Sequence, residues 1–250
     1  IVVGLSVVSG VAIVVSLRRQ ASVTQLKDNL VATVTHELKT PVSSIRLLVD
    51  TLLDENKRDR IDAREYIELI SRENQRLGRL IDNFLSFSRM ERAKGSFDIR
   101  PLPAAEVAKS AETAFRERFA GQTFELVVDI QDEIPDIAGD GDALATALGN
   151  LLENALKYGG PGRRIELSVS RAEQGAEFSV RDFGSGIDRR ERKRIFRKFY
   201  QGSESGGGHL GGVGLGLSIV DFIVSRHTGR IELESELGEG SVFKMRIPYA

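Results

Sequence analysis

The sequence predicts an α+β protein in which an N-terminal helical hairpin precedes a C-terminal two-layer α/β sandwich. Apolar residues recur at heptad spacing over residues 20–54 and again over 62–90, which is typical of two long amphipathic helices. A segment rich in turn-forming residues follows at 94–103 and indicates a linker. Beyond it, helical and strand patterns mix as they do in two-layer sandwiches. The chain of 250 residues is 41% apolar, which suffices for two domains and excludes a wholly disordered protein.

The first long helix has two apolar seams. The residues of these seams are Val31, Leu38, Ile45 and Leu52 on one line, and Val34, Pro41 and Leu48 on the other. The charged residues 54–60 predict a polar turn, so the two helices are expected to form an antiparallel hairpin over residues 18–93. One hairpin buries only one of its two apolar flanks, and we therefore expect a homodimer with a four-helix bundle. A monomeric hairpin docked on the rest of the chain is the alternative.

Residues 1–17 are apolar and uncharged, and Arg18 and Arg19 follow them directly. As a helix this segment spans ~26 Å, slightly less than the ~30 Å hydrocarbon core of a bilayer. We expect it to be the C-terminal part of a transmembrane helix, since basic residues after a span place the following residues in the cytoplasm. A buried core helix is the alternative.

The C-terminal domain is expected over residues 104–250. Its expected helices lie at 104–119, 141–158 and 214–227, and its expected strands at 123–130, 164–171, 176–182, 230–235 and 241–247. These elements account for the sandwich named above.

Composition excludes several classes of function. The net charge is -1, from 35 basic and 36 acidic side chains, which disfavours a nucleic-acid partner. The basic run at 189–194 is interpreted as a solvated helix face. Without cysteine the chain has no disulfide, thiolate metal site or cysteine nucleophile. Its three histidines are too scattered for a histidine-built metal site, and we expect His209 and His227 to have no functional role.

The third histidine, His36, is the candidate nucleophile. It lies about 200° around the helix from both Val34 and Leu38, so it points away from the apolar seam toward water. A neutral imidazole is nucleophilic near pH 7, and the adjacent Glu37 could accept its proton. Pro41 cannot donate to the Glu37 carbonyl, and we expect a weakened or kinked helix there. Taken singly, a surface histidine is more often inert.

Five sequence motifs in order resemble those of the sensor histidine kinases of bacterial two-component systems. The motifs are HELKTP (36–41), NLLENALKY (150–158), DFGSGI (182–187), IFRKF (195–199) and GGVGLGLSIV (211–220). The resemblance covers about residues 20–248 and extends to LGEGSVF (237–243). It implies a dimeric histidine-bearing bundle joined to an ATP-binding domain of the fold shared with gyrase and heat-shock chaperones.

The helix at 141–158 fits the nucleotide site that this resemblance implies. Asn150, Asn154 and Lys157 form one polar stripe, with apolar residues on the opposite face. A neutral amide oxygen can hold Mg²⁺ without repelling a triphosphate, and the family uses the position of Asn154 for this metal. The ammonium group of Lys157 can form an ion pair with a phosphate group directly. A solvated helix face is the simpler explanation, and it is a poor one for the whole stripe.

Two glycine-containing segments complete the expected site. Asp182 closes a strand, and its carboxylate can accept a hydrogen bond from the exocyclic amine of adenine, while Gly184 and Gly186 let the backbone approach the base. Alone, DFGSG is as readily a turn. The resemblance implies ATP and Mg²⁺ as cofactors. The remaining nucleotide-binding residues that it implies are Tyr158, Ile187, Phe196, Phe199, Gly212, Gly214, Leu215 and Gly216, the last three beside a helix N-terminus that favours phosphate.

The resemblance also implies an activity and partners. His36 would be phosphorylated from ATP with Glu37 as base, and the phosphoryl group would pass to an aspartate of a response regulator. Thr40 occupies the position that supports dephosphorylation of that regulator. The expected location is the bacterial inner membrane, through the N-terminal helix, with the kinase region in the cytoplasm.

Two positions depart from the family pattern. Val213 stands where a hydroxyl is frequent, and Gln201 stands where an arginine is frequent. They favour an alternative function, a catalytically silent dimeric interaction module whose nucleotide only sets the conformation of the bundle. Intact His36, Asn154 and Asp182 oppose that alternative.

Overall fold

A computed structural model describes Thr35 and residues 38–54, 62–92, 97–160, 162–198, 200 and 214–250. Several of the predictions above fall outside these residues: the apolar segment 1–17, most of the turn at 54–60, and the positions of His36, Glu37, Phe199, Gln201, His209, Gly212 and Val213. The chain divides into two compact units at residues 84 and 85, and each is described by itself. In the part of the chain that the structure describes, no helix is both long and apolar enough to span a membrane.

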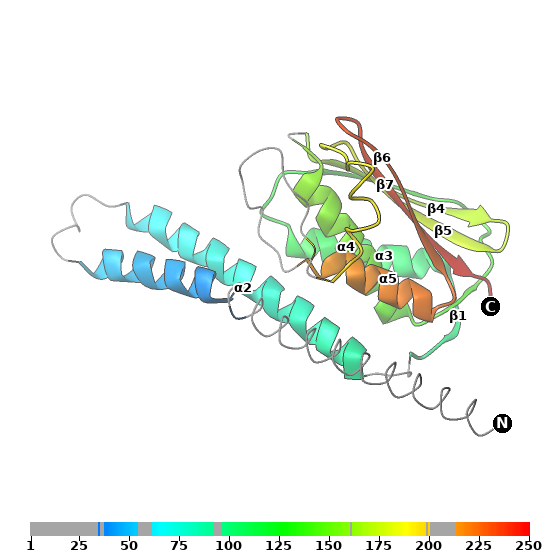
Figure 1. Ribbon diagram of the computed structural model, residues 1–250, viewed down its shortest axis with the longest axis horizontal. Helices are drawn as coiled ribbons and strands as arrows, with labels where there is room; N and C mark the ends of the chain where they lie inside the picture. The colour runs from blue at the N-terminus through cyan, green and yellow to red at the C-terminus, as the bar shows by residue number, and fades with distance from the viewer. Residues whose placement is uncertain are drawn as a thin grey trace, which may run out of the picture. The chain divides into compact units, whose positions relative to one another are not determined.

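The first unit contains the helix at residues 38–53 and α2 as far as Phe84. Residues 38–53 are helical, and α2 spans Ala63–Arg92 (Figure 1). The helix at 38–53 continues through Pro41, which is buried. On α2 the side chain of Leu80 is buried as well, with 5% of its surface exposed. Pro41 lies on the second predicted seam of its helix, and the other described seam residues, Leu38, Ile45, Leu48 and Leu52, are partly buried. Both predicted segments are helical where the structure describes them.

The second unit is a five-stranded sheet with three helices on one face (Figure 1). Its helices are α3 (Ala104–Arg118), α4 (Gly141–Tyr158) and α5 (Gly216–Arg226), and its strands are β2 (Glu125–Ile130), β4 (Arg164–Ala172), β5 (Gly175–Asp182), β6 (Arg230–Glu236) and β7 (Gly240–Pro248). The strand order is β2-β4-β5-β7-β6. Only β2 and β4 pair in parallel, and the other neighbours are antiparallel. The α+β prediction with a two-layer sandwich is confirmed.

The core of this unit lies between the sheet and α4. Alternate residues of the central strands point inward, so that Leu167, Phe178 and Met245 are at most 1% exposed. Leu144, Leu148, Leu151 and Leu152 of α4 are fully buried. Burial of each such side chain stabilises the fold by about 1.5–3 kcal/mol, which fixes the rotation of α4 about its axis. The opposite stripe of α4 is thereby turned away from the sheet.

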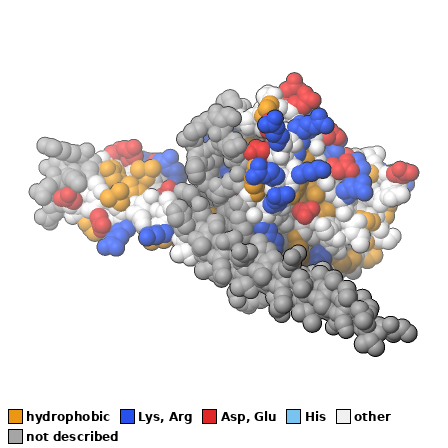
Figure 2. Space-filling model, viewed as in Figure 1, with side chains coloured by type: hydrophobic (Ala, Val, Ile, Leu, Met, Phe, Trp, Pro, Cys, Tyr) orange, Lys and Arg blue, Asp and Glu red, His pale blue; other side chains and the backbone are white. Residues whose placement is uncertain are grey.

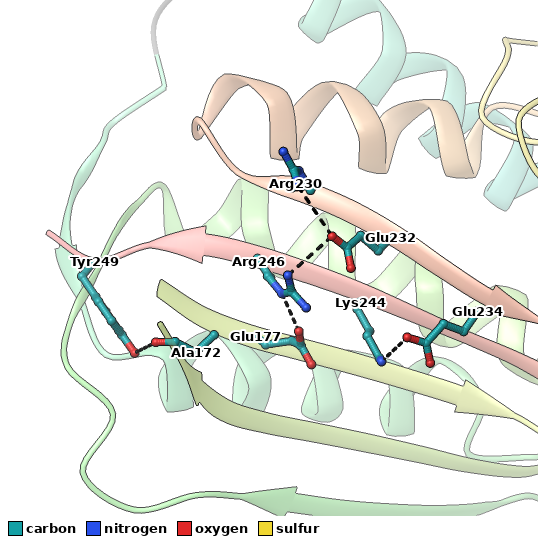
Figure 3. Close-up of polar contacts among 8 residues, drawn as sticks. All are labelled: Ala172, Glu177, Arg230, Glu232, Glu234, Lys244, Arg246 and Tyr249. Carbon is teal, nitrogen blue, oxygen red and sulfur yellow. Dashed lines mark hydrogen bonds and ion pairs between the residues drawn. The ribbon is translucent and has the colours of Figure 1, made fainter. Parts of the chain in front are cut away.

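The other face of the sheet is charged (Figure 3). Arg246 of β7 pairs with Glu177 of β5 at 2.6 Å and with Glu232 of β6 at 3.5 Å. Lys244 pairs with Glu234 at 2.5 Å. Such exposed pairs contribute at most about 1 kcal/mol each, and they make this face a solvated surface. Figure 2 shows basic and acidic side chains intermixed on the face of this unit that is turned to the viewer.

The structure differs from the sequence prediction at three places. Residues 100–102, expected within the linker, form β1 (Arg100–Leu102), which pairs with the unpredicted β3 (Ile137–Gly139). Three-residue strands are too short to show alternation, so only the pairing reveals them. The basic run at 189–194 forms turns and not a helix. Arg192 is half-buried there and donates to the carbonyls of Ile187 and Ser235.

Candidate nucleotide-binding site

The polar stripe of α4 faces the beginning of α5. The Nδ2 of Asn150 donates to the Thr146 carbonyl at 2.9 Å. The Oδ1 of Asn150 takes no part in this hydrogen bond. A Cβ atom placed on Gly216 would lie 3.1 Å from this Oδ1 and 4.0 Å from Asn154 Nδ2. The first residue of α5 therefore lies against two asparagines that precede it by more than sixty positions in the sequence. The absence of a side chain at Gly216 lets the two helices approach this closely.

Asn154 has an unsatisfied amide. Its Nδ2 atom is buried and has no hydrogen-bond partner, one of two such side-chain atoms in the described residues. A buried unpaired amide costs about 1–3 kcal/mol, so its retention points to a partner that completes the site. Turned by 180°, the same amide presents an oxygen, the type of ligand that Mg²⁺ prefers. No group of three or more His, Asp or Glu side chains among the described residues could hold a metal alone. Asn154 thus fits a cation that takes its other oxygens from phosphate and water.

The N-terminus of α5 provides free backbone donors. Gly214 has a φ of 68°, and Leu215, at the N-cap position, is 1% exposed. Leu215 makes no side-chain capping hydrogen bond, and the first turn of α5 holds no acidic residue. The N–H groups of the first turn have no partner within the helix, and together with the helix dipole they favour an anion at this end. Lys157 at the end of α4 adds a cation whose Nζ lies 2.6 Å from the Tyr158 hydroxyl.

Asp182 is buried at the end of β5. It is 4% exposed, and its Oδ1 accepts from the backbone N–H of Gly184 at 3.0 Å. The N–H and the hydroxyl of Ser241, its neighbour on β7, donate to the same carboxylate. Burial raises the pKa of Asp182 above its ordinary value, and these hydrogen bonds oppose the rise without cancelling it. The result is a desolvated carboxylate with a fixed orientation.

The Asp182 loop packs directly on the end of α4. A Cβ on Gly184 would lie 2.6 Å from the Tyr158 carbonyl carbon and 3.0 Å from Gly159 Cα, so only glycine fits there. Gly186 has a φ of 67° and lies equally close to the backbone of Glu236. The loop is therefore held between α4 and the β6–β7 turn. This contact brings the amide stripe and the buried carboxylate to one end of the sheet.

Sequence reasoning missed a serine below this loop. Ser235 is 7% exposed, and its Oγ accepts from the N–H of Ile187 at 2.8 Å. It also donates to the Gly240 carbonyl at 2.9 Å and lies 3.1 Å from the hydroxyl of Ser241. The signal for it was present in the sequence, because Ser235 follows Ile231 and Leu233 on the inward-facing register of β6. A polar residue in such a register needs a partner, and here the partner is the loop.

The other predicted residues are placed as follows. Tyr158 is 40% exposed, and Lys157 Nζ lies 4.5 Å from the centroid of its ring. The Phe196 ring packs edge-on against Phe243 of β7, with centroids 6.4 Å apart. Thr40 lies on the first unit, exposed on its helix. The structure therefore brings together Asn150, Asn154, Gly214, Leu215 and Gly216, and it brings Asp182, Gly184 and Gly186 to the end of α4.

Two families match consecutive parts of the chain. Residues 26–93 match the His Kinase A (phospho-acceptor) domain. Residues 139–250 match the histidine kinase-, DNA gyrase B- and HSP90-like ATPases. The second match contains the whole site described above from α4 onward.

Characterised proteins show the same similarity over most of the chain. The circadian input-output histidine kinase CikA of Synechococcus elongatus is 33% identical over 225 residues, which cover 89% of this chain and 30% of CikA. The sensor-like histidine kinase SenX3 of Mycobacterium tuberculosis is 31% identical over 222 residues, covering 89% and 54%. The structure of ShkA with AMPPNP has a TM-score of 0.60 and 28% identity, covering 88% and 45%. The chain thus spans about half of SenX3 and less of CikA.

Proposed function

Because this chain belongs to the sensor histidine kinases of two-component systems, we propose that it transfers the γ-phosphoryl group of ATP to His36 and then to a response regulator. The observation that carries this proposal is the meeting of three groups at one end of the sheet: the amides of α4, the uncapped N-terminus of α5 and the buried Asp182. They match the three parts of a magnesium nucleotide, namely the cation, the phosphates and the base.

Each group has a distinct role in this proposal. Asp182 accepts a hydrogen bond from the exocyclic amine of adenine, for which its ionised form is the stronger acceptor. The N–H groups at Gly214–Gly216 and the ammonium of Lys157 bind phosphate oxygens. Asn154 would hold Mg²⁺, which supplies neutralisation of phosphate charge when bound, and Asn150 would contact the nucleotide beside it. Tyr158, Ile187 and Phe196 would border the nucleotide, and Phe199 and Gly212 would complete its surroundings.

The chemistry proposed for His36 is an in-line displacement. A ring nitrogen of His36 forms a bond to the γ-phosphorus, the bond from that phosphorus to the β–γ bridging oxygen breaks, and ADP leaves. The ring proton passes to Glu37, the adjacent carboxylate. The phosphoryl group then moves to an aspartate of the regulator. Thr40, one turn after His36, would orient water for hydrolysis of the aspartyl phosphate on the regulator, which releases inorganic phosphate.

The hairpin also supports a homodimer. Beside its buried seam it exposes large apolar side chains, among them Val42 at 51%, Leu53 at 74% and Ile67 at 60%. One hairpin leaves this second flank in water, and a second copy would cover it in a four-helix bundle. The proposed phosphoacceptor domain covers residues 18–93, and the proposed ATP-binding domain covers 104–250, with the linker of 94–103 contributing β1.

We further propose that residues 1–17 belong to a transmembrane helix, which would place the kinase region at the cytoplasmic face of a bacterial inner membrane. The support is the uncharged apolar sequence and the two arginines that follow it. The nearly balanced charge of the chain continues to disfavour a nucleic-acid partner.

Incubation with γ-labelled ATP tests the proposed activity. The wild-type chain is expected to acquire label that is labile in acid and stable in base, as a phosphohistidine is. The His36→Gln variant should bind ATP with unchanged affinity and acquire no label. Label retained in that variant would refute the assignment of His36. A wild-type chain that binds ATP and takes up no label would instead support the silent interaction module.

A further inference from the structure

Asp140 is a junction of three segments of the second unit. Its Oδ1 accepts from the N–H of Ala143 at 3.1 Å and caps the N-terminus of α4. Its Oδ2 accepts from the N–H of Asp98 at 3.1 Å. Its own N–H donates to Nε2 of His227, at the end of α5, at 2.9 Å. One residue therefore joins the chain that enters the unit, the start of α4 and the end of α5.

His227 has a structural environment that its sequence position did not predict. It is 3% exposed, and its Nδ1 lies 2.7 Å from the Ile223 carbonyl in the last turn of α5. Nδ1 therefore donates to this carbonyl, and Nε2, which accepts from Asp140, carries no proton. The sequence predicted no functional role for His227, and the structure shows that its ring joins the end of α5 to the residue that caps α4.

The entering segment is held by the same two residues. The Phe97 ring lies 5.3 Å from the His227 ring and 6.2 Å from the Phe222 ring, centroid to centroid. The next residue, Asp98, makes the hydrogen bond to Asp140 described above. Ring contacts of this kind add about 0.5–1.5 kcal/mol beyond burial. The segment at 97–98 is thus fixed to the unit by a side chain and by a backbone donor, in the sequence that leads from the hairpin.

The clamp that Asp140 and His227 form and the nucleotide site lie at opposite ends of the same helix pair. Asp140 and His227 join the beginning of α4 to the end of α5, whereas Asn150 and Asn154 face Gly216 at the beginning of α5. Because α-helices are stiff, a shift of α5 against α4 at the clamp also moves the Gly214–Gly216 donors relative to the asparagines. Binding of a phosphate between them would in turn fix the clamp.

We propose that Asp140 and His227 are positioning residues that couple docking of Phe97 and Asp98 to binding of the magnesium nucleotide, so that each strengthens the other. This inference rests on the proposed function, since it assigns a control element to the same site. The linker can thereby affect the nucleotide site, because a hairpin movement that detaches residues 97–98 would weaken nucleotide binding. Coupling between two bound groups is reciprocal and typically amounts to 5–150-fold.

Hydrogen exchange of the Asp98 amide measures this coupling directly. That amide donates to Asp140, so its exchange reports how often the segment detaches. We expect Mg-AMPPNP at saturation to slow its exchange fivefold or more in the full chain. In the His227→Phe variant, which keeps an aromatic ring against Phe97 and loses both ring nitrogens, this protection should fall below twofold.

Nucleotide affinity measured by calorimetry supplies the reciprocal test. Asp98→Pro removes the N–H donor and should lower the affinity for Mg-AMPPNP by the same factor, fivefold or more. Asp98→Ala is the matched control, because it keeps the N–H and loses only an exposed carboxylate that lies 4.0 Å from Arg100. Its affinity should stay within twofold of wild type. Phe97→Ala should lower the affinity for the nucleotide. Ile99→Ala, which changes a half-exposed neighbouring residue, should leave that affinity unchanged.

The outcomes separate this inference from the proposed function. If the chain binds Mg-AMPPNP and Asp98 exchanges at an unchanged rate, the coupling is refuted and the proposed kinase activity stands. The coupling is likewise refuted if folded Asp98→Pro protein keeps its affinity within twofold. Should Asp98→Pro fail to fold, the exchange measurement on the wild-type chain still decides. A chain that binds no nucleotide refutes both proposals.

Discussion

Gly184→Ala tests the claim that the Asp182 loop owes its position to backbone packing against α4. The new Cβ would lie 2.6 Å from the Tyr158 carbonyl carbon and 3.0 Å from Gly159 Cα, and still closer to the Tyr158 oxygen. Carbon atoms in contact are about 3.5–4.0 Å apart, so the two backbone segments must separate by roughly 1 Å. Neither segment can relax by changing a rotamer. We expect a loss of about 3 kcal/mol, at the upper end of the cost of overpacking.

Calorimetry of unfolding and of ATP binding measures both consequences. For a domain of this size, 3 kcal/mol lowers the unfolding temperature by roughly 6–12 °C. A misplacement of about 1 Å typically costs on the order of 100-fold in function, and we expect ATP affinity to fall by a similar factor. Gly149→Ala is the matched control for stability, since a Cβ there meets no atom within 4 Å. In a helix this change should stabilise by about 1 kcal/mol. A Gly184→Ala protein with wild-type unfolding temperature and ATP affinity would show that the packing argument is wrong.

Two further predictions concern the same carboxylate and its support. Because burial raises the pKa of Asp182, ATP affinity should fall as the pH drops through a midpoint above the ordinary aspartate value of about 3.9. The contribution of this group to folding stability has the opposite pH dependence. It is largest at low pH and is lost as the pH rises through the pKa of Asp182 in the folded protein. Titration calorimetry from pH 8 down to the lowest pH at which the protein stays folded checks the first part, and an affinity that begins to fall only below the ordinary aspartate value would contradict it. Ser235→Ala leaves the Ile187 N–H without its acceptor, which should lower the stability of the fold by about 1–3 kcal/mol and the affinity for ATP about tenfold. Ser179→Ala, on the same sheet with its side chain half-exposed, is the control and should bind ATP as the wild type does.

The helices and long strands of the second unit follow closely from local patterns. The predicted helix at 141–158 has the bounds of α4, because Asp140 caps its start and Gly159 follows its end. Strands β4, β5 and β7 were predicted to within a residue at each end, because their alternating apolar residues indicate which face of the strand is buried. The pair β1 and β3 was missed because three residues carry no period.

Residue type and spacing alone determined that Asn150, Asn154 and Lys157 share one face of a helix and that Asp182 ends a strand. Only the tertiary structure decided that this face meets Gly216, that Ser235 supports the Asp182 loop, and that His227 is bonded to Asp140. The reason is that helical and strand periods are properties of neighbouring residues. Contacts across 48 to 87 positions depend on how the buried faces of α4, α5 and the sheet pack together.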